Sequence, residues 1–247
     1  MKLISFRNIL KSLKGYFLFK YFKIISRKIS YNQNEIINEG YYSQAGQDKF
    51  VSECLFENTR EGTFVDIGAN DGVKLSNTLH FENKGWNGLA IEPHPKIYKN
   101  LISNRNCTCL NLGITSEKGT RIFRSIDGPV NMLSGFVDLY DKRHDERISH
   151  EINLHGGKYE DIEVPCNSLH SILEVHNIKH IDFLSIDVEG AELEILRTLD
   201  FKRVNVSVIT VENNYKDFRI PRLLQKSGFR IIAMIGDDNV FLNKTFK

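Results

Sequence analysis

The fold is decided by Val65-Asp66-Ile67-Gly68-Ala69-Asn70-Asp71-Gly72, where a short apolar run ends in an acid and a glycine-rich turn. A buried strand here delivers the chain to a tight turn, in which Gly68 and Gly72 allow the backbone to approach a ligand closely. Further along, a second apolar run, Leu89-Ala90-Ile91, ends in another acid, Glu92. A carboxylate in that place suits the two adjacent hydroxyls of a ribose. The pattern therefore predicts a site for a nucleoside-like cofactor at the carboxyl ends of two parallel strands.

Strand and helix signals alternate through the rest of the chain from about residue 40. The apolar runs predict strands at 64–67, 89–92, 109–112, 183–186 and 206–211, and a terminal strand pair at 230–235 and 239–242. The helical patterns lie at 44–56, 76–81, 97–102, 169–175, 191–199 and 219–226. Alternating units that end in a hairpin predict an α/β fold, with a mostly parallel sheet and one antiparallel strand.

Residues 113–165 interrupt this rhythm. They hold turn residues, a short strand signal at 120–124, and a polar tract at 138–161. The tract is too long for an ordinary connection, which indicates a functional loop or an insertion that contacts substrate. It contains His144, His150 and His155, and a histidine in a polar loop is more often solvated than catalytic.

Length and charge divide the chain into two parts. The 247 residues suit one large domain, or one domain with an appendage. Residues 1–30 hold eight of the 33 basic residues and none of the 31 acids, so the remainder carries 25 basic and 31 acidic residues. This asymmetry argues against a nucleic-acid-binding core and for a surface contact made by the N-terminal part. We therefore expect a basic segment and linker at 1–40 and one domain at 41–247.

The basic segment has the pattern of an amphipathic helix. Its apolar side chains recur every three or four positions, at Phe6, Leu10, Leu13, Phe17, Tyr21 and Ile24. Interspersed lysines disfavour a membrane-spanning helix, and no uninterrupted apolar region suggests a cleaved signal peptide. Two interpretations stay open: the helix lies on anionic lipid, or it docks on the domain or on a partner chain.

The four cysteines carry no metal-site or disulfide pattern. No pair has CxxC spacing, and four are too few for a disulfide framework. We expect them to be reduced and the protein to be cytoplasmic, with peripheral contact at the inner membrane surface if the basic helix binds lipid.

Four acids follow four predicted parallel strands: Asp66, Glu92, Asp187 and Glu212. Ligands of open α/β sheets bind beyond the carboxyl ends of the strands, so these acids should converge on one crevice. Asp187 and Glu189 lie two apart in Asp187-Val188-Glu189-Gly190-Ala191-Glu192, and either could act as a general base on a substrate hydroxyl. The alternative for Glu189 is a cap on the following helix.

With these motifs the chain resembles FkbM-type members of the class I S-adenosylmethionine-dependent methyltransferases. The resemblance covers about residues 41–244 and rests on residues 43–48, 64–72, 76–78, 88–93 and 187–192. It implies a Rossmann-like fold whose seven-strand, mostly parallel sheet has one antiparallel strand and helices on both faces. It also implies methylation of a hydroxyl, often on a sugar, glycolipid or polyketide.

The resemblance also implies roles for particular residues. Glu92 would bind the ribose hydroxyls, and Asp187 and Glu189 would be the catalytic residues at the point of methyl transfer, with Asp187 the preferred base. The implied cofactor-binding residues are Gln47, Asp66, Gly68, Asn70, Asn77, Glu92, Pro93 and Asp187. The expected partner is a small-molecule or glycan acceptor. The chain departs from the family at Leu169-His170-Ser171, where members often have paired acids.

Three other functions remain as alternatives. In a metal-dependent O-methyltransferase, Asp187, Glu212 and Asn213 would hold Mg²⁺, which lowers the pKa of the acceptor hydroxyl. An NAD-dependent oxidoreductase is disfavoured, because the acid precedes the glycines and the G-x-G-x-x-G spacing is absent. A non-catalytic partner module with a cofactor-type fold is the third.

Overall fold

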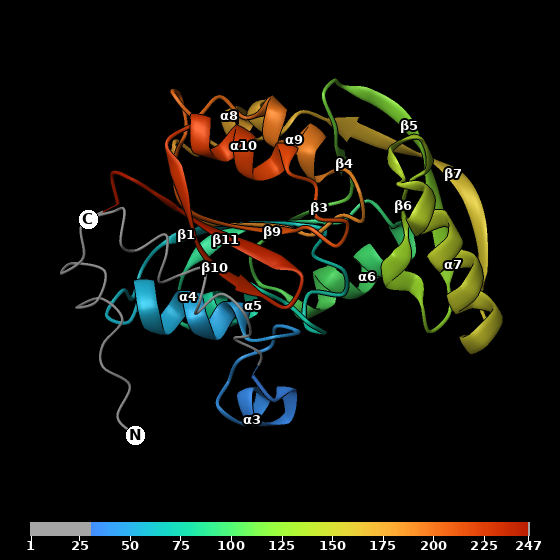
Figure 1. The fold of residues 1–247 in the computed structure, drawn as a ribbon, viewed down its shortest axis with the longest axis horizontal. Coiled ribbons are helices and arrows are strands. Elements are labelled where there is room, and N and C mark those ends of the chain that lie inside the picture. Colours follow the sequence, from blue (N-terminus) through green and yellow to red (C-terminus); the bar gives the residue numbers. More distant parts are fainter. Residues whose placement is uncertain (1–30, 247) are drawn as a thin grey trace.

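The computed structural model describes residues 31–246, and its main body is a seven-stranded sheet (Figure 1). The strand order is β10-β11-β9-β8-β1-β2-β3. The strands are β1 Thr63–Ile67, β2 Asn87–Ile91, β3 Thr108–Leu110, β8 His180–Ile186, β9 Asn205–Glu212, β10 Phe229–Ile235 and β11 Asp238–Asn243. The β1, β2, β3, β8 and β9 strands pair in parallel, whereas β11 is antiparallel to both of its neighbours. This confirms the predicted mostly parallel sheet with one antiparallel strand.

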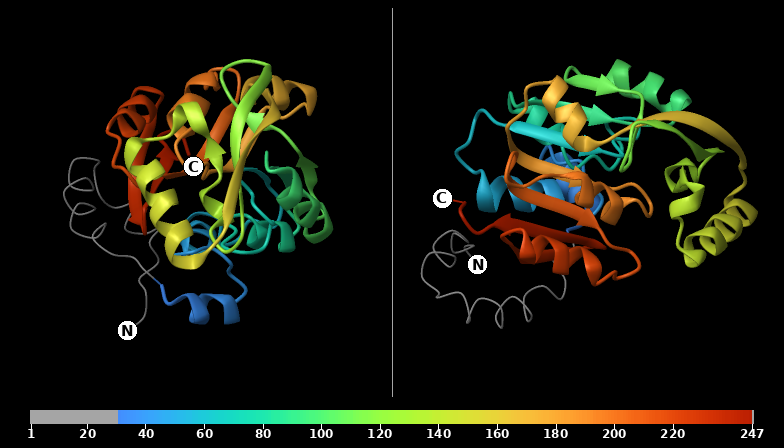
Figure 2. Two further views of the ribbon diagram at one scale, coloured as in Figure 1. Left: turned by 90° about the vertical axis from the view of Figure 1, so that its right-hand side faces the viewer. Right: turned by 90° about the horizontal axis from the view of Figure 1, so that it is seen from above.

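Helices cover both faces of the sheet, as predicted. One face carries α8 Leu169–Val175, α9 Glu192–Thr198 and α10 Arg219–Lys226, and the other carries α4 Gln47–Leu55, α5 Leu79–Asn83 and α6 Pro95–Asn104 (Figures 1 and 2). Central strands covered on both faces bury nearly every residue, which explains their continuous apolar runs. Because β2 and β8 flank β1 on opposite sides, their turns open a crevice at the carboxyl end of β1.

The prediction of a loop at 138–161 is wrong, because most of this region forms a helix and part of a strand. A second sheet has the order β4-β7-β5-β6. Its strands are β4 Gly113–Ile114, β5 Gly119–Asp127, β6 Gly135–Phe136 and β7 Lys158–Asn167. The helices in the same part of the chain are η1 Asn131–Leu133, η2 Val137–Leu139 and α7 Lys142–His155. The long β5–β7 ribbon extends from the main sheet and α7 packs beside it (Figure 2). Helix α7 buries only His144 and Ile148, so its sequence lacks the apolar stripe that would have revealed a helix.

Three boundaries near the start of the domain also differ from the prediction. The helix expected at 44–56 begins at Gln47, because Gly46 has a left-handed backbone with φ of +88°. The helix expected at 76–81 begins at Leu79, whose N–H donates to Ser76 Oγ over 3.1 Å. The linker contains helix α3, Gln33–Asn38, which buries Ile36. The linker is therefore part of the folded domain.

The predicted amphipathic helix at 1–30 lies outside the described residues. Within residues 31–246, no helix combines the length and the apolar character needed to cross a membrane.

Candidate functional site

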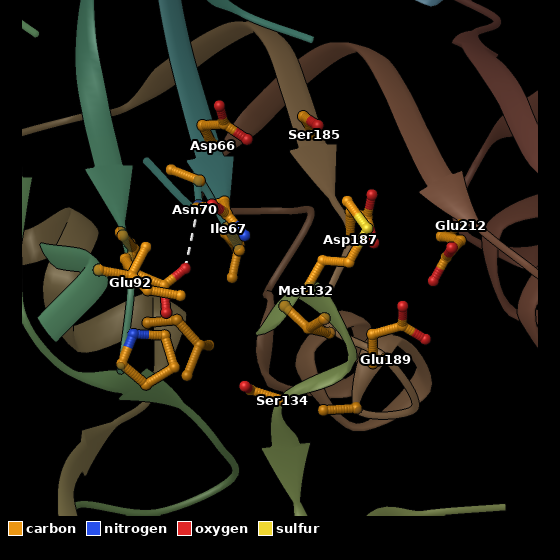
Figure 3. A pocket seen from close by; sticks show the side chains of 18 of the residues that line it. Asp66, Ile67, Asn70, Glu92, Met132, Ser134, Ser185, Asp187, Glu189 and Glu212 are labelled. Carbon is orange, nitrogen blue, oxygen red and sulfur yellow. Dashed lines mark hydrogen bonds between the residues drawn. The ribbon is translucent and has the colours of Figure 1, made fainter. Parts of the chain in front are cut away.

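One pocket lies at the carboxyl ends of β1, β2, β8 and β9, and all four predicted acids line it. Figure 3 shows Glu92 across the pocket from Glu189 and Glu212, with Met132 and Ser134 drawn between them. The other predicted site residues also line this pocket: Gln47, Gly68, Asn70, Asn77, Pro93 and Glu189. The pocket thus brings together the four acids and the other catalytic and cofactor-binding residues predicted from the sequence.

The turn after β1 is tied closely to its two neighbours. Gly68 has φ of +86°, and a Cβ built there would lie 1.7 Å from the carbonyl oxygen of Asp187. The Gly68 N–H donates to the Ile91 carbonyl over 3.0 Å, and the Asp187 N–H donates to the Ile67 carbonyl over 3.0 Å. Only glycine combines this backbone with such a close approach. The turn therefore holds the ends of β2 and β8 in one fixed arrangement.

Glu92 is buried and held in one orientation by the backbone. Its Oε2 accepts the Asn70 N–H over 2.9 Å, and its Oε1 accepts the His94 N–H over 2.8 Å (Figure 3). A carboxylate offers about four lone-pair directions, so each oxygen retains capacity for a ligand hydroxyl. Burial raises the pKa of Glu92 to about 7. Geometry and chemistry both suit a pair of adjacent hydroxyls.

Asp66 and Gln47 line the pocket but are bonded within the protein. Asp66 Oδ2 accepts the Thr78 hydroxyl over 2.6 Å and lies 3.9 Å from Arg105 Nη1. Burial raises the pKa of Asp66, against the opposing effect of Arg105. The Gln47 amide donates to Asp238 Oδ2 over 3.1 Å and accepts the Ala45 N–H over 2.9 Å. Both residues thus brace the pocket wall.

Asn77 carries an acceptor that the described residues leave unpaired. Its Nδ2 donates to Ser185 Oγ over 3.1 Å, whereas its buried Oδ1 has no hydrogen-bond partner within residues 31–246. A buried polar atom without a partner costs about 1–3 kcal/mol. An unpaired acceptor in the pocket wall, together with the Glu92 carboxyl, fits a ligand that has both a hydroxylated ring and a hydrogen-bond donor.

Asp187, Glu189 and Glu212 form an acidic wall opposite Glu92. The Asp187 side chain is open to the pocket, yet the protein around it still desolvates the carboxyl and raises its pKa to about 6. Glu189 is buried, and burial raises its pKa to about 8. At neutral pH, Asp187 is therefore the carboxyl of this pair that is ready to accept a proton.

The capping alternative for Glu189 is wrong. Glu192 is the residue that closes the turn, because its Oε1 accepts the Gly190 N–H over 2.9 Å and the Val188 N–H over 3.4 Å. Glu189 instead adopts a left-handed backbone with φ of +56°, and its side chain faces the pocket (Figure 3). Such a conformation costs about 1–3 kcal/mol in a residue other than glycine and is typical of functional sites.

The residues proposed for a metal are not assembled into one site. Asn213 does not line the pocket, and its amide bonds the backbone N–H and carbonyl of Asp217. In the described part of the chain, no group of three or more His, Cys, Asp or Glu side chains is arranged to hold a metal ion.

The sequence missed the residues that the second sheet brings to this pocket. The pocket lining includes Met132, Ser134 and Arg147 from that part of the chain. His144, expected to be solvated, is fully buried, and its Nδ1 lies 3.3 Å from Glu189 Oε2. Arg105, also missed, is buried beneath the β1 turn and bonds Glu82 over 2.6 Å. No local pattern marks any of these residues, because their partners lie far away in the sequence.

The buried acids predict an unusual dependence of stability on pH. Burial raises the pKa of Glu189 and Asp238 to about 8, so the folded state binds more protons than the unfolded chain between about pH 4 and about pH 8. The free energy of unfolding should therefore fall as pH rises from about 7 to about 9. Histidines whose pKa is lowered by burial, such as His144, influence the pH dependence of stability only below about pH 6.5.

Chemical denaturation at several pH values tests this expectation. Asp238→Asn should flatten the decline, because the amide needs no proton to stay neutral. Glu61→Gln, at an exposed acid that does not act on Asp238 or Glu189, is the control and should keep the wild-type slope. Stability that rises through this pH range in the wild type would contradict the prediction.

Comparisons with known proteins bear on this site. A model of the methyltransferase FkbM domain matches residues 66–231, which span the glycine turn and the acids that follow β2, β8 and β9. The chain is also similar to methyltransferase sdnD from Sordaria araneosa, with 29% identity over 192 residues. That alignment covers 68% of this chain and 73% of the relative.

Proposed function

Because the chain belongs to the FkbM methyltransferase family, we propose that it transfers the methyl group of S-adenosylmethionine to a hydroxyl of a sugar or glycoconjugate. The seven-stranded sheet suits a Rossmann-like class I methyltransferase fold, in which the cofactor binds at the carboxyl ends of the strands. The observation that carries the proposal is Glu92. Two backbone N–H groups orient its buried carboxyl toward the pocket, next to a glycine turn.

The remaining pocket residues fit the rest of that cofactor. The unpaired Asn77 Oδ1 can accept a hydrogen bond from an ammonium group, and the acidic wall suits a positively charged ligand. The bound cofactor supplies a methyl group on a sulfonium, which is a reactive donor without further activation. The protein then has to align the acceptor oxygen, exclude water and receive the hydroxyl proton.

Asp187 is the residue that we assign to receive the proton. Its carboxyl is open to the pocket, and its pKa of about 6 leaves it ionised at neutral pH. The second sheet forms the side of the pocket next to Asp187 and contributes polar and apolar groups, including Asn131, Met132 and Ser134. A mixed lining of this kind suits a hydroxylated ring, which supports a sugar-like acceptor.

Calorimetry and a methyl-transfer screen test the proposal. S-adenosylmethionine should bind and NAD should not. Radiolabelled methyl should pass from the cofactor to members of a panel of sugars, nucleotide sugars and glycolipids. Activity that survives exhaustive EDTA treatment excludes the metal-dependent alternative, and activity restored only by Mg²⁺ supports it. Absence of cofactor binding would overturn the proposed function.

We also propose that the protein works in the cytoplasm, with residues 1–30 in peripheral contact with anionic membrane. The support is the segment of eight basic and no acidic residues on a domain of opposite net charge, together with four free cysteines. Basic side chains near an anionic surface contribute about 1 kcal/mol each, an attraction that salt screens.

Liposome sedimentation tests the membrane contact. The full chain should sediment with anionic vesicles at low salt and be released at high salt, whereas a chain that begins at Tyr31 should stay in solution. The shorter chain keeps helix α3 and should melt at the temperature of the full chain. If it melts well below that temperature and neither chain binds vesicles, the segment packs on the domain instead.

A further inference from the structure

Helix α7 brings a buried histidine to the acidic wall of the pocket. His144 Nε2 lies 3.1 Å from the Leu133 carbonyl oxygen, and the ring of Tyr140 packs at 4.5 Å between centroids. A carbonyl oxygen can only accept, so Nε2 carries the hydrogen of the neutral ring. Nδ1 is then an acceptor, and it lies 3.3 Å from Glu189 Oε2.

Because the hydrogen of the His144 ring is on Nε2, a hydrogen bond between His144 Nδ1 and Glu189 must be donated by Glu189. A neutral His144 offers one lone pair at Nδ1, so Glu189 can hydrogen-bond there only when its own carboxyl is protonated. The Tyr215 hydroxyl lies at the same distance of 3.3 Å and competes for that lone pair. Glu189 Oε2 is buried, and no hydrogen bond of good geometry satisfies it within residues 31–246. Catalytic hydrogen bonds are often long before ligands bind and shorten in the complex. The strained backbone of Glu189 keeps its carboxyl at this position.

The surrounding charges agree with a protonated Glu189. Burial raises the pKa of Glu189 to about 8 and lowers the pKa of His144. Arg147 Nη1, 3.6 Å from Glu189 Oε2, acts in the opposite direction on Glu189, but burial has the larger effect. The other groups that act electrostatically on the pair are Asp187, Glu192 and Glu212 from the main sheet, Asp141 and Asp145 near α7, and the Tyr140 and Tyr215 hydroxyls.

We propose that His144 is a positioning residue, whose Nδ1 accepts a hydrogen bond from Glu189 and so holds Glu189 against the acceptor, while Asp187 receives the acceptor's proton. The inference rests on the proposed function. In the transfer, the acceptor O–H bond breaks and its proton goes to Asp187. The new C–O bond forms as the C–S bond breaks, and its electron pair stays on sulfur. Glu189 keeps its own proton and orients the acceptor.

Nitrogen NMR of the His144 ring tests the contact without any acceptor. Tyr215 OH also lies 3.3 Å from Nδ1, so the variants are compared in a Tyr215→Phe background. Glu189→Gln should keep the Nδ1 signal of a hydrogen-bonded acceptor, because its amide N–H replaces the carboxyl O–H. Glu189→Leu should move that signal to the frequency of a free lone pair. Identical Nδ1 signals in the Gln and Leu variants would overturn the proposal.

Turnover tests the role in catalysis once the screen provides an acceptor. His144→Gln should lower kcat by up to about 10²-fold, the scale expected from a small misplacement, with an unchanged affinity for S-adenosylmethionine. His150→Gln, at an exposed position of the same helix, is the matched control and should behave as wild type. Glu189→Leu should lose at least about tenfold more turnover than Glu189→Gln.

Two results would overturn the catalytic part of the inference. Equal turnover of the His144→Gln and His150→Gln variants would remove His144 from the active site. A Glu189→Gln variant as inactive as Asp187→Asn would make Glu189 the base. If the wild type binds no S-adenosylmethionine, the proposed function fails, and the NMR comparison still decides whether His144 and Glu189 form a pair.

Discussion

Asp187→Asn should lower turnover far more than it lowers the affinity for S-adenosylmethionine, while the fold remains. Loss of a general base typically lowers the rate by about 10²–10⁴-fold. Asp187 follows β8 at the pocket, and its carboxyl is open to the acceptor side. Asparagine has nearly the same shape but cannot receive a proton. Steady-state kinetics, calorimetry and thermal melts together separate the loss of chemistry from a loss of binding or folding.

The pH profile gives a second test of the same assignment. The pKa of Asp187 is raised to about 6, so kcat/KM should increase as pH rises through about 6 and the base becomes ionised. Asp200→Asn changes an exposed acid that follows α9 and is the matched control. Near-wild-type turnover of Asp187→Asn on the true acceptor would show that another group receives the proton.

Glu92→Ala should weaken cofactor binding by about 2–4 kcal/mol, or about 30- to 10³-fold. Under the proposed placement of the cofactor, the variant would lose two hydrogen bonds to the ribose hydroxyls and the charge that strengthens them. Alanine also leaves the Asn70 and His94 N–H groups without their acceptors, so it should lower thermal stability as well. Glu92→Gln keeps one oxygen acceptor and should give a smaller loss of both binding and stability.

The pKa of Glu92 predicts how binding depends on pH. Burial raises this pKa to about 7, so the ionised form becomes dominant as pH rises through neutrality. Cofactor affinity should therefore increase from about pH 6 to about pH 8, and Glu92→Gln should reduce this dependence. Glu57→Ala, at an exposed acid, is the control for binding. A calorimetric affinity unchanged in Glu92→Ala would contradict the placement of the ribose.

Local sequence was enough to predict the main sheet and the part of the site that the ends of its strands form. The order of apolar runs and helical patterns determined the alternation of strands and helices, and the terminal strand pair predicted at 230–235 and 239–242 corresponds to the antiparallel strands β10 and β11. Glu92 and Asp187 could be placed in one pocket because parallel strands end at the same edge of a sheet. This geometric rule needs no knowledge of side-chain packing.

The prediction of a loop at 138–161 was wrong for a physical reason. A helix or strand can be predicted from the sequence when it buries a regular apolar face. Helix α7 buries few residues, and an ion pair between Arg124 of β5 and Asp145 helps to hold it to the second sheet. Charged pairs of this kind leave no periodic signal, so the segment resembles a polar loop.

The sequence by itself determined the family, the parallel sheet and the acids at its edge, because the alternation of apolar runs with helical patterns and the glycine turns are local features of the sequence. Only the tertiary structure decided that His144 and Arg147 face Glu189, that Arg105 lies beneath Asp66, and that Asn213 is turned away. These contacts join residues that are distant along the chain. Their distances depend on how two sheets pack together, which no local pattern of residue types encodes.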